Sequence, residues 1–173
     1  MAHPYAPHLP DFSYRGKHHY SLTFSTHERQ SIFVAAPAVD LVRTQVLRAC
    51  TEKSFELTAY CFMPDHLHLL VRGLADDSDC RRFITSAKQY SGYTYKREFK
   101  QRLWSRYGYE RVIREPIERA LTIRYILENP VEAGLASRVS DYAFVGSARH
   151  TVAELIETAG LPAEKPAAAQ TSG

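Results

Sequence analysis

The chain has 173 residues, of which 45% are hydrophobic and 24% are charged, and this composition fits one soluble domain large enough to close its own core. Its three cysteines, Cys50, Cys61 and Cys80, lack the paired spacing of a zinc site or a disulfide framework, and no stretch approaches the ~20 apolar residues of a membrane span. The net charge of +3 is mild, but residues 81–114 hold ten Lys or Arg against two Glu. We therefore expect a cytoplasmic protein with one basic segment.

The first half of the chain predicts one helix and three strands. Alternation of apolar and polar residues indicates the first strand, and apolar residues at helical spacing behind Pro37 indicate the helix. The next two segments are rich in β-branched and aromatic residues and are separated by a short turn, which favours a hairpin. In chain order we expect an irregular arm (1–17), a strand that ends in a polar turn (18–29), a helix (36–54), a strand (55–63), a Pro64-Asp65 turn and a strand (66–73).

The second half predicts two further helices around a short strand. The first helix follows acidic residues that suit the positive end of a helix dipole, and the second should end at Asn129-Pro130 because the residue before proline avoids helical backbone angles. We expect a helix from about Asp79 to Lys100, an irregular segment from 103 feeding a strand near Arg111 to Ile113, a helix from Pro116 to about Glu128, and a disordered tail (158–173). Strands alternating with helices imply an α+β fold, in which residues 18–157 form the domain.

His66 and His68 stand one residue apart within the third predicted strand. Side chains alternate faces along a strand, so both imidazoles point the same way and lie about 7 Å apart along it, close enough to converge on one ion. Two hydrogen-bonded histidines at a half-buried sheet position would give the same pattern. The pair therefore indicates a metal site only if further ligands are found elsewhere.

The helix that begins at Pro116 divides into two sides. Its apolar residues spread over one broad side that should face the core: Ile117, Ala120, Leu121, Ile123, Ile126 and Leu127. Its other side carries Glu118, Thr122, Tyr125 and Asn129, with Tyr125 and Asn129 one turn apart. A tyrosine nucleophile and an amide oxygen, added to two histidines, are what metal-assisted phosphodiester cleavage needs. Considered alone, Tyr125 also fits an exposed aromatic.

At this point the sequence resembles the single-tyrosine HUH transposases, and most closely the REP-associated tyrosine transposases. The matching segments span most of residues 18–150 and read MPDHLHLLV (63–71), LWSRYGYERVIRE (103–115), RYILENPVEAGL (124–135) and DYAFVGSAR (141–149). The resemblance implies the ferredoxin-like HUH endonuclease fold, a central antiparallel sheet with flanking helices. It also implies that Tyr125 attacks the scissile phosphate of DNA, leaving a 5′-phosphotyrosine and a free 3′-hydroxyl.

The same resemblance implies a metal site. His66 and His68 match the family's metal-binding pair, and Asn129 stands where the family carries an amide side chain, commonly Gln in the insertion-sequence branch. The family uses Mg²⁺ or Mn²⁺. Two imidazoles with an amide suit Mn²⁺ somewhat better than Mg²⁺, which prefers oxygen ligands only.

The basic segment interleaves its cations with aromatic residues, a mixture that suits single-stranded or hairpin DNA because cations hold phosphates and aromatic rings stack on unpaired bases. Half or more of these aromatics should nevertheless be core residues. The DNA contacts we favour are Lys96, Arg97, Arg102, Arg106 and Arg111. Other tyrosines near basic residues, namely Tyr90, Tyr93, Tyr107 and Tyr109, could be the nucleophile, but only Tyr125 has an amide one turn away.

Three hypotheses follow, in order of preference. The first is a metal-dependent transposase that cleaves and rejoins single-stranded or hairpin DNA, acting as a monomer or a homodimer. The second is a repressor of a repeat element that binds nucleic acid on the same fold without cutting it. The third is a metal-dependent hydrolase of small phosphoesters, which would not need Tyr125.

Overall fold

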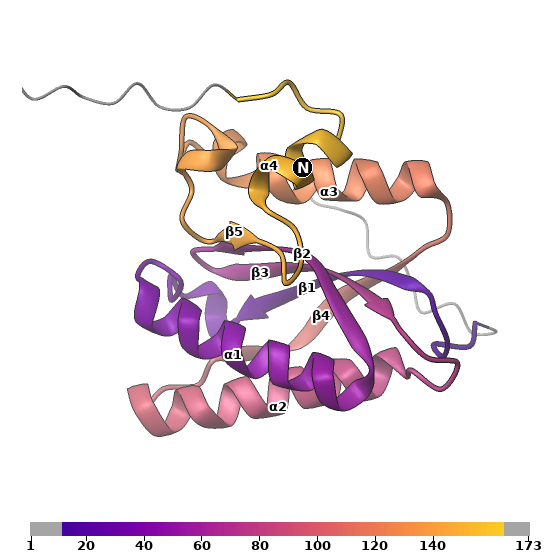
Figure 1. Cartoon of the computed structure of the whole chain (residues 1–173). Helices are drawn as coiled ribbons and strands as arrows, with labels where there is room; N and C mark the ends of the chain where they lie inside the picture. Colours follow the sequence, from indigo (N-terminus) through magenta and orange to yellow (C-terminus); the bar gives the residue numbers. More distant parts are fainter. Residues whose placement is uncertain (1–11, 165–173) are drawn as a thin grey trace, which may run out of the picture.

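The computed structural model describes residues 12–164 of the chain, and Figure 1 shows its helices and strands. The strands are β1 (His19–Thr26), β2 (Phe55–Met63), β3 (His66–Gly73), β4 (Trp104–Ile113) and β5 (Val145–Gly146). The helices are α1 (Ala36–Lys53), α2 (Cys80–Phe99), α3 (Pro116–Glu132) and α4 (Val152–Thr158), with two short 3-10 turns at His27–Arg29 and Val139–Asp141.

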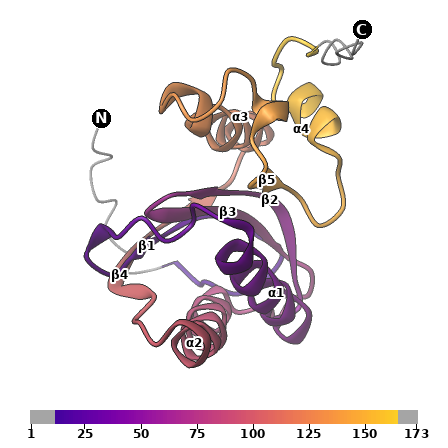
Figure 2. The same ribbon diagram turned by 90° about the vertical axis from the view of Figure 1, so that its left-hand side faces the viewer.

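The five strands form one sheet in the order β4-β1-β3-β2-β5, and every neighbouring pair is antiparallel. Helices α1 and α2 cover one face of the sheet, while α3 and α4 lie on the other (Figures 1 and 2). The predicted α+β fold with a central antiparallel sheet is therefore confirmed. These two sides of the sheet are named the α1/α2 face and the α3 face.

The α1/α2 face carries the larger core. Every second residue of β1 points into it, and Tyr20, Leu22 and Phe24 are almost completely buried there. Helix α1 contributes the apolar side that its spacing predicted, including Val42, and α2 contributes buried residues such as Phe83. Because α1 and α2 also pack against each other, this side of the sheet is closed to solvent.

The α3 face carries a smaller core, and it covers only part of the sheet. Ile123, Ile126 and Leu127 of α3 are buried against residues from β2, β3 and β4. Ile117 and Leu121, predicted to face the core, are instead 66% and 58% exposed. That prediction was wrong because the side of α3 that packs on the sheet is narrower than predicted: it is centred on Ile123, Ile126 and Leu127, and at ~100° per residue Ile117 and Leu121 point away from it.

Two element boundaries also differ from the prediction. Strand β4 runs for ten residues from Trp104, rather than the short segment near Arg111 to Ile113, because it pairs along most of β1 at the sheet edge. Helix α3 continues through Pro130 to Glu132. The helix is terminated by Gly134, two residues after its last helical residue, whose φ of 71° is left-handed. The Leu135 N–H then donates to the Pro130 carbonyl at 2.8 Å.

The ends of the described range are tied to the domain. Tyr14 of the predicted irregular arm is buried. In contrast to the disorder expected from residue 158 onward, Leu161 packs on the smaller core, and the Glu164 carboxylate accepts from the Val139 and Ser140 N–H groups at 2.9 and 3.0 Å. The rest of the predicted arm and tail, residues 1–11 and 165–173, lies outside the described residues. Within residues 12–164, no helix has the length and apolar character needed to cross a membrane.

Candidate DNA-processing site

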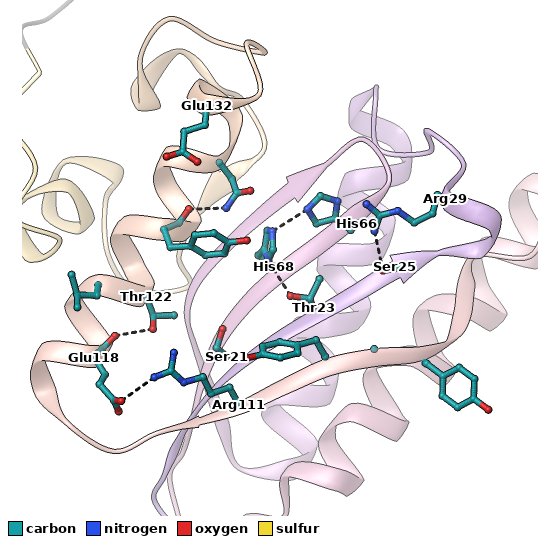
Figure 3. Close-up of a pocket in the computed structure, with 16 residues that line it drawn as sticks. Ser21, Thr23, Ser25, Arg29, His66, His68, Arg111, Glu118, Thr122 and Glu132 are labelled. Atoms are coloured by element: carbon teal, nitrogen blue, oxygen red, sulfur yellow. Dashed lines mark hydrogen bonds and ion pairs between the residues drawn. The ribbon is translucent and has the colours of Figure 1, made fainter. Parts of the chain in front are cut away.

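A pocket of about 950 Å³ lies on the α3 face, between α3 and polar residues of β1, β3 and β4. Figure 3 shows the strands forming its floor and α3 forming one wall. The lining residues are Ser21, Thr23, Ser25, Arg29, His66, His68, Tyr107, Gly108, Tyr109, Arg111, Glu118, Leu121, Thr122, Tyr125, Asn129 and Glu132. The polar side of α3 predicted from the sequence, Glu118 to Asn129, thus faces this pocket.

The two histidines of β3 point to the same side, and their rings converge (Figure 3). Their Nε2 atoms are 2.9 Å apart, and the His68 side chain is buried. On the far side of each ring, the Nδ1 atom has its own partner: Asp65 Oδ1 at 2.6 Å from His66, and Thr23 Oγ1 at 3.1 Å from His68. Both rings are therefore held in orientation through Nδ1, with Nε2 directed toward the neighbouring histidine.

Tyr125 lies directly beside this pair. Its ring packs edge-to-face on the His68 ring, with 5.4 Å between the centroids, and its side chain remains 38% exposed to the pocket. The helix that carries it begins at Pro116, and a capping box between Glu115 and Glu118 fixes that start. Tyr125 and the histidines, 57 residues apart or more in sequence, are thus brought together by the packing of α3 on the sheet.

Asn129 lines the same pocket, one turn beyond Tyr125. Its Nδ2 donates to the Tyr125 carbonyl oxygen at 2.7 Å, so its amide is anchored to its own helix. Among residues 12–164 there is no group of three or more His, Cys, Asp or Glu able to hold a metal ion.

The donor set fits a divalent cation. A carboxylate only accepts hydrogen bonds, so the contact with Asp65 puts the proton of a neutral His66 on Nδ1 and leaves a lone pair on Nε2. Two imidazole nitrogens 2.9 Å apart are also spaced as adjacent ligands of one ion would be, given metal–imidazole distances of about 2.1 Å. His66 and His68 are thus suitable ligands, with Asn129 within the same pocket.

The residues predicted to contact DNA are distributed over two sides of the domain. Of the five, Arg111 lines the pocket, where its Nη2 lies 2.9 Å from Glu118 Oε1. Hydrogen bonds from the Arg114 and Glu115 N–H groups, with the nearby Arg111 charge, lower the pKa of the Glu118 carboxyl, which keeps it ionised to orient that guanidinium.

The other four lie outside the pocket lining. Lys96 and Arg97 are in the last turn of α2, across the sheet from the pocket. Arg102 donates to the Trp104 carbonyl at 3.1 Å, and Arg106 of β4 lies 5.6 Å from the centre of the Tyr107 ring.

The four other tyrosines considered as nucleophiles also lie on two sides of the sheet. Tyr90 and Tyr93 belong to α2, on the closed side of the sheet, and the Tyr90 hydroxyl donates to Glu52 at 2.6 Å. Tyr107 and Tyr109 line the pocket, and Tyr107 is 70% exposed. The basic segment also contributes buried aromatics to the core, as expected, including Phe83, Tyr95 and Trp104.

Several residues in or beside the pocket were missed by the sequence reasoning. Asp65 was interpreted only as part of a turn, although it directly precedes His66. Ser21, Thr23 and Ser25 alternate with apolar residues along the first strand, and this alternation was a signal that one face of the strand is polar. Arg29 and Glu132 had no sequence signal that set them apart from other surface charges.

Comparisons with known proteins identify the family and the fold of the chain. A family model described as "Transposase IS200 like" matches residues 14–127, well over half of the chain. A Haemophilus influenzae protein described as a REP-associated tyrosine transposase is 26% identical over 132 residues, which cover 65% of this chain and 70% of that protein.

Two solved structures are similar. One, a REP-associated tyrosine transposase bound to a REP hairpin, matches with a TM-score of 0.67 at 19% identity over 80% of this chain and 81% of that chain. The other, a Deinococcus radiodurans protein described as a transposase, matches with a TM-score of 0.52 at 25% identity over 68% of this chain and 94% of that chain. The fold is therefore that of a REP-associated tyrosine transposase, and the chain belongs to the IS200-like transposase family.

Proposed function

We propose that this transposase cleaves and rejoins single-stranded or hairpin DNA through a covalent 5′-phosphotyrosine at Tyr125, with a divalent metal ion held by His66 and His68. The observation that carries the proposal is the packing of the Tyr125 ring on His68, beside two imidazoles whose Nε2 atoms are 2.9 Å apart. A nucleophile and a cation site in contact within one pocket suit phosphoryl transfer better than binding alone.

His66 and His68 would hold Mg²⁺ or Mn²⁺ through Nε2, and the Asn129 amide would be the third protein ligand. When bound, such an ion polarises a phosphoryl oxygen and neutralises charge that develops on the phosphate. In cleavage, the Tyr125 phenol oxygen forms a bond to phosphorus as the bond from phosphorus to the 3′ oxygen breaks. The phenol proton is lost to solvent, and the leaving 3′ oxygen takes up a proton to become a hydroxyl.

Rejoining is the reverse reaction. A 3′-hydroxyl attacks the phosphotyrosine and releases Tyr125, so the energy of the phosphodiester bond is conserved and no ATP is needed. This step requires the cleaved end to stay in the pocket, where Arg111 is placed to contact a phosphate. A hydrolase would instead release the end to water.

Hairpin DNA is the substrate we propose, since a solved relative of the same fold is bound to a REP hairpin. Lys96, Arg97, Arg102, Arg106 and Arg111 would contact phosphates. The Tyr107 ring is exposed at the pocket and can stack on an unpaired base.

The decisive experiment traps the covalent intermediate. Purified protein is incubated with Mn²⁺ and a library of labelled hairpin oligonucleotides with single-stranded flanks, and adducts are resolved on a denaturing gel. We expect an adduct with the wild type and with Tyr90→Phe, whose phenol lies on the far side of the sheet. Tyr125→Phe should give none.

Each other outcome assigns a different function or nucleophile. An adduct that persists in Tyr125→Phe but disappears in Tyr109→Phe would transfer the nucleophile to β4. Salt-dependent hairpin binding without any adduct, unchanged by His66→Ala, would contradict the proposal and favour a non-cutting repressor. Turnover of small phosphoesters that is indifferent to Tyr125 would favour a hydrolase.

A further inference from the structure

The turn that precedes His66 is held rigidly against the end of β1. The Asp65 carbonyl accepts two hydrogen bonds from Thr26, one from its N–H at 3.0 Å and one from its hydroxyl at 2.9 Å. The adjacent Pro64 carbonyl accepts from the N–H groups of Ile32 and Phe33 at 2.8 and 3.0 Å. Thr26 is completely buried, so this attachment is shielded from water. The backbone of Asp65 is thereby fixed relative to the pocket.

The Asp65 side chain joins two pocket residues. One carboxylate oxygen lies 2.6 Å from His66 Nδ1, and the other lies 2.9 Å from Arg29 Nε. Arg29 also donates from Nη1 to the Ser25 hydroxyl at 3.1 Å, a contact visible in Figure 3. The carboxylate therefore has a partner on each oxygen and is held between the guanidinium and the imidazole.

The backbone at Arg29 is unusual. Glu28 and Arg29 both have positive φ, 52° and 56°, a left-handed conformation that residues other than glycine rarely adopt. This pair lies in the 3-10 turn that follows β1, and the Arg29 side chain contacts Ser25 at the end of the strand and Asp65. Strain of this kind persists only where surrounding contacts hold it, and it concentrates at functional sites.

The two histidines differ in how firmly their protons are placed. Asp65 only accepts, so it fixes His66 with the proton on Nδ1 and a lone pair on Nε2. The Thr23 hydroxyl can donate or accept, so it permits either tautomer of His68. In the metal-free protein, His68 can donate its Nε2–H to the Nε2 of His66 across the 2.9 Å between these atoms. In the other tautomer, the Nε2 lone pair of His68 is available to a cation.

We propose that Asp65 is a positioning residue that holds His66 as the Nδ1–H tautomer, with its Nε2 lone pair directed at His68, and that Arg29 keeps the Asp65 carboxylate in place. The consequence for metal binding rests on the proposed function, because it assumes that the histidines hold the ion. The tautomer itself is a property of the metal-free protein.

The tautomer can be read directly by NMR. In metal-free protein carrying ¹⁵N-labelled histidine at pH 8, where an ordinary imidazole is neutral, two-bond ¹H–¹⁵N correlations distinguish the two tautomers. We expect His66 in the Nδ1–H form in the wild type and a shift toward Nε2–H in Asp65→Ala, with partial return in Asp65→Glu. An Nε2–H wild-type signal, or one unchanged by Asp65→Ala, would overturn the proposal.

Affinity for Mn²⁺ alone, measured by titration calorimetry, gives a second reading. Loss of a carboxylate behind a ligating histidine typically weakens metal binding roughly 10–100-fold, and we expect Asp65→Ala to fall in that range. Arg29→Gln should weaken binding less, because Arg29 acts through Asp65. The matched control is Asp40→Ala, which breaks an arginine ion pair on α1 and should leave the affinity unchanged.

The outcomes separate this proposal from the function. If Mn²⁺ affinity and tautomer respond to Asp65 but no DNA adduct forms, the cleavage proposal fails and the positioning role stands. If adducts form and neither reading responds to Asp65→Ala, the positioning role fails and cleavage stands. Should Asp65→Ala not fold, the wild-type tautomer and Arg29→Gln decide.

Discussion

The two faces of the sheet use the same strands for opposite purposes. On β1, Tyr20, Leu22 and Phe24 enter the core beneath α1 and α2, whereas the residues between them, Ser21 and Thr23, line the pocket on the α3 face. On β3, Leu67 and Leu69 are buried in the same core, while His66 and His68 face the pocket. One strand therefore supplies both a stabilising surface and a chemical one, separated by the two-residue period of the backbone.

The difference between the faces shows where this fold can carry polar groups. The α1/α2 face is mostly apolar because two helices pack on it, and buried polar groups there, such as Ser91, which accepts from the Trp104 indole N–H, have partners inside the core. The α3 face is covered only where the apolar side of α3 packs, and the open part is lined by polar side chains that bond to one another, as Thr23 does to His68. Mutations on the two faces should accordingly separate stability from activity.

Phe24→Ala should have the largest effect on folding. Its ring is buried 5.6 Å from that of Trp104, and removing a buried phenylalanine typically costs about 3–5 kcal/mol of unfolding free energy. Its neighbour on the opposite face provides the matched change: Thr23→Val loses one hydrogen bond to His68, worth about 1 kcal/mol. Urea unfolding followed by circular dichroism measures both. Equal losses would mean that the two faces contribute alike to stability.

Mn²⁺ should stabilise the protein only through the α3 face. At a free concentration one hundred times its dissociation constant, a ligand that binds only the native state adds about 2.7 kcal/mol, which appears as a higher melting temperature. We expect this rise in the wild type and in His150→Ala, a surface histidine beside α4, and its loss in His66→Ala and His68→Ala. A rise that persists in both pocket variants would place the cation elsewhere.

How far the sequence predicts the fold depends on whether one signal dominates each segment. Strands β2 and β3 and helices α1 and α2 are predictable within a residue or two. Their signals agree with their flanking turns: β-branched and aromatic content for the strands, apolar spacing for α1, and acidic residues before α2. Strand β4 is not, because it is an edge strand that contains a glycine and no regular alternation of apolar residues, and its extent is set by pairing with β1. The end of α3 is misjudged because Pro130 is tolerated in the last turn and Gly134 sets the terminus.

The candidate site is predictable only in part for the same reason. The histidine pair and the Tyr125 side of α3 follow from local periodicity, so their placement around one pocket required only that α3 pack on the sheet. The hydrogen-bond partners of the histidines cannot be predicted from local periodicity. Thr23 reaches His68 through strand pairing, and Arg29 reaches Asp65 across the end of β1 through left-handed backbone, neither of which leaves a local sequence pattern.

Gly108→Ala tests whether the pocket depends on the close approach of β4 to β1. A Cβ there would lie 2.8 Å from the Thr23 carbonyl oxygen, so the edge strand must shift, at a cost of about 1–3 kcal/mol. Gly92→Ala, in the interior of α2, is the matched change: its Cβ would meet Trp104 at an ordinary 3.5 Å and should stabilise the helix by about 0.5–1 kcal/mol. The two substitutions should change the melting temperature in opposite directions. A Gly108→Ala variant with a raised melting temperature would show that β4 can move away from β1 without cost.

Alkaline pH should expose the smallest difference, through a tyrosine on the α3 side. Burial raises the pKa of Tyr142 to about 12, and its hydroxyl donates to the Phe62 carbonyl at 2.6 Å. Between pH 10 and 12 the unfolded chain therefore releases this proton before the folded protein does, so stability falls as pH rises through that window.

Tyr142→Phe loses the hydrogen bond, about 1 kcal/mol at pH 7, but the stability of this variant should fall less steeply above pH 10. Parallel slopes in urea titrations at pH 9 and 11 would assign the alkaline loss to other groups, such as Tyr20 in the α1/α2 core, whose pKa burial also raises.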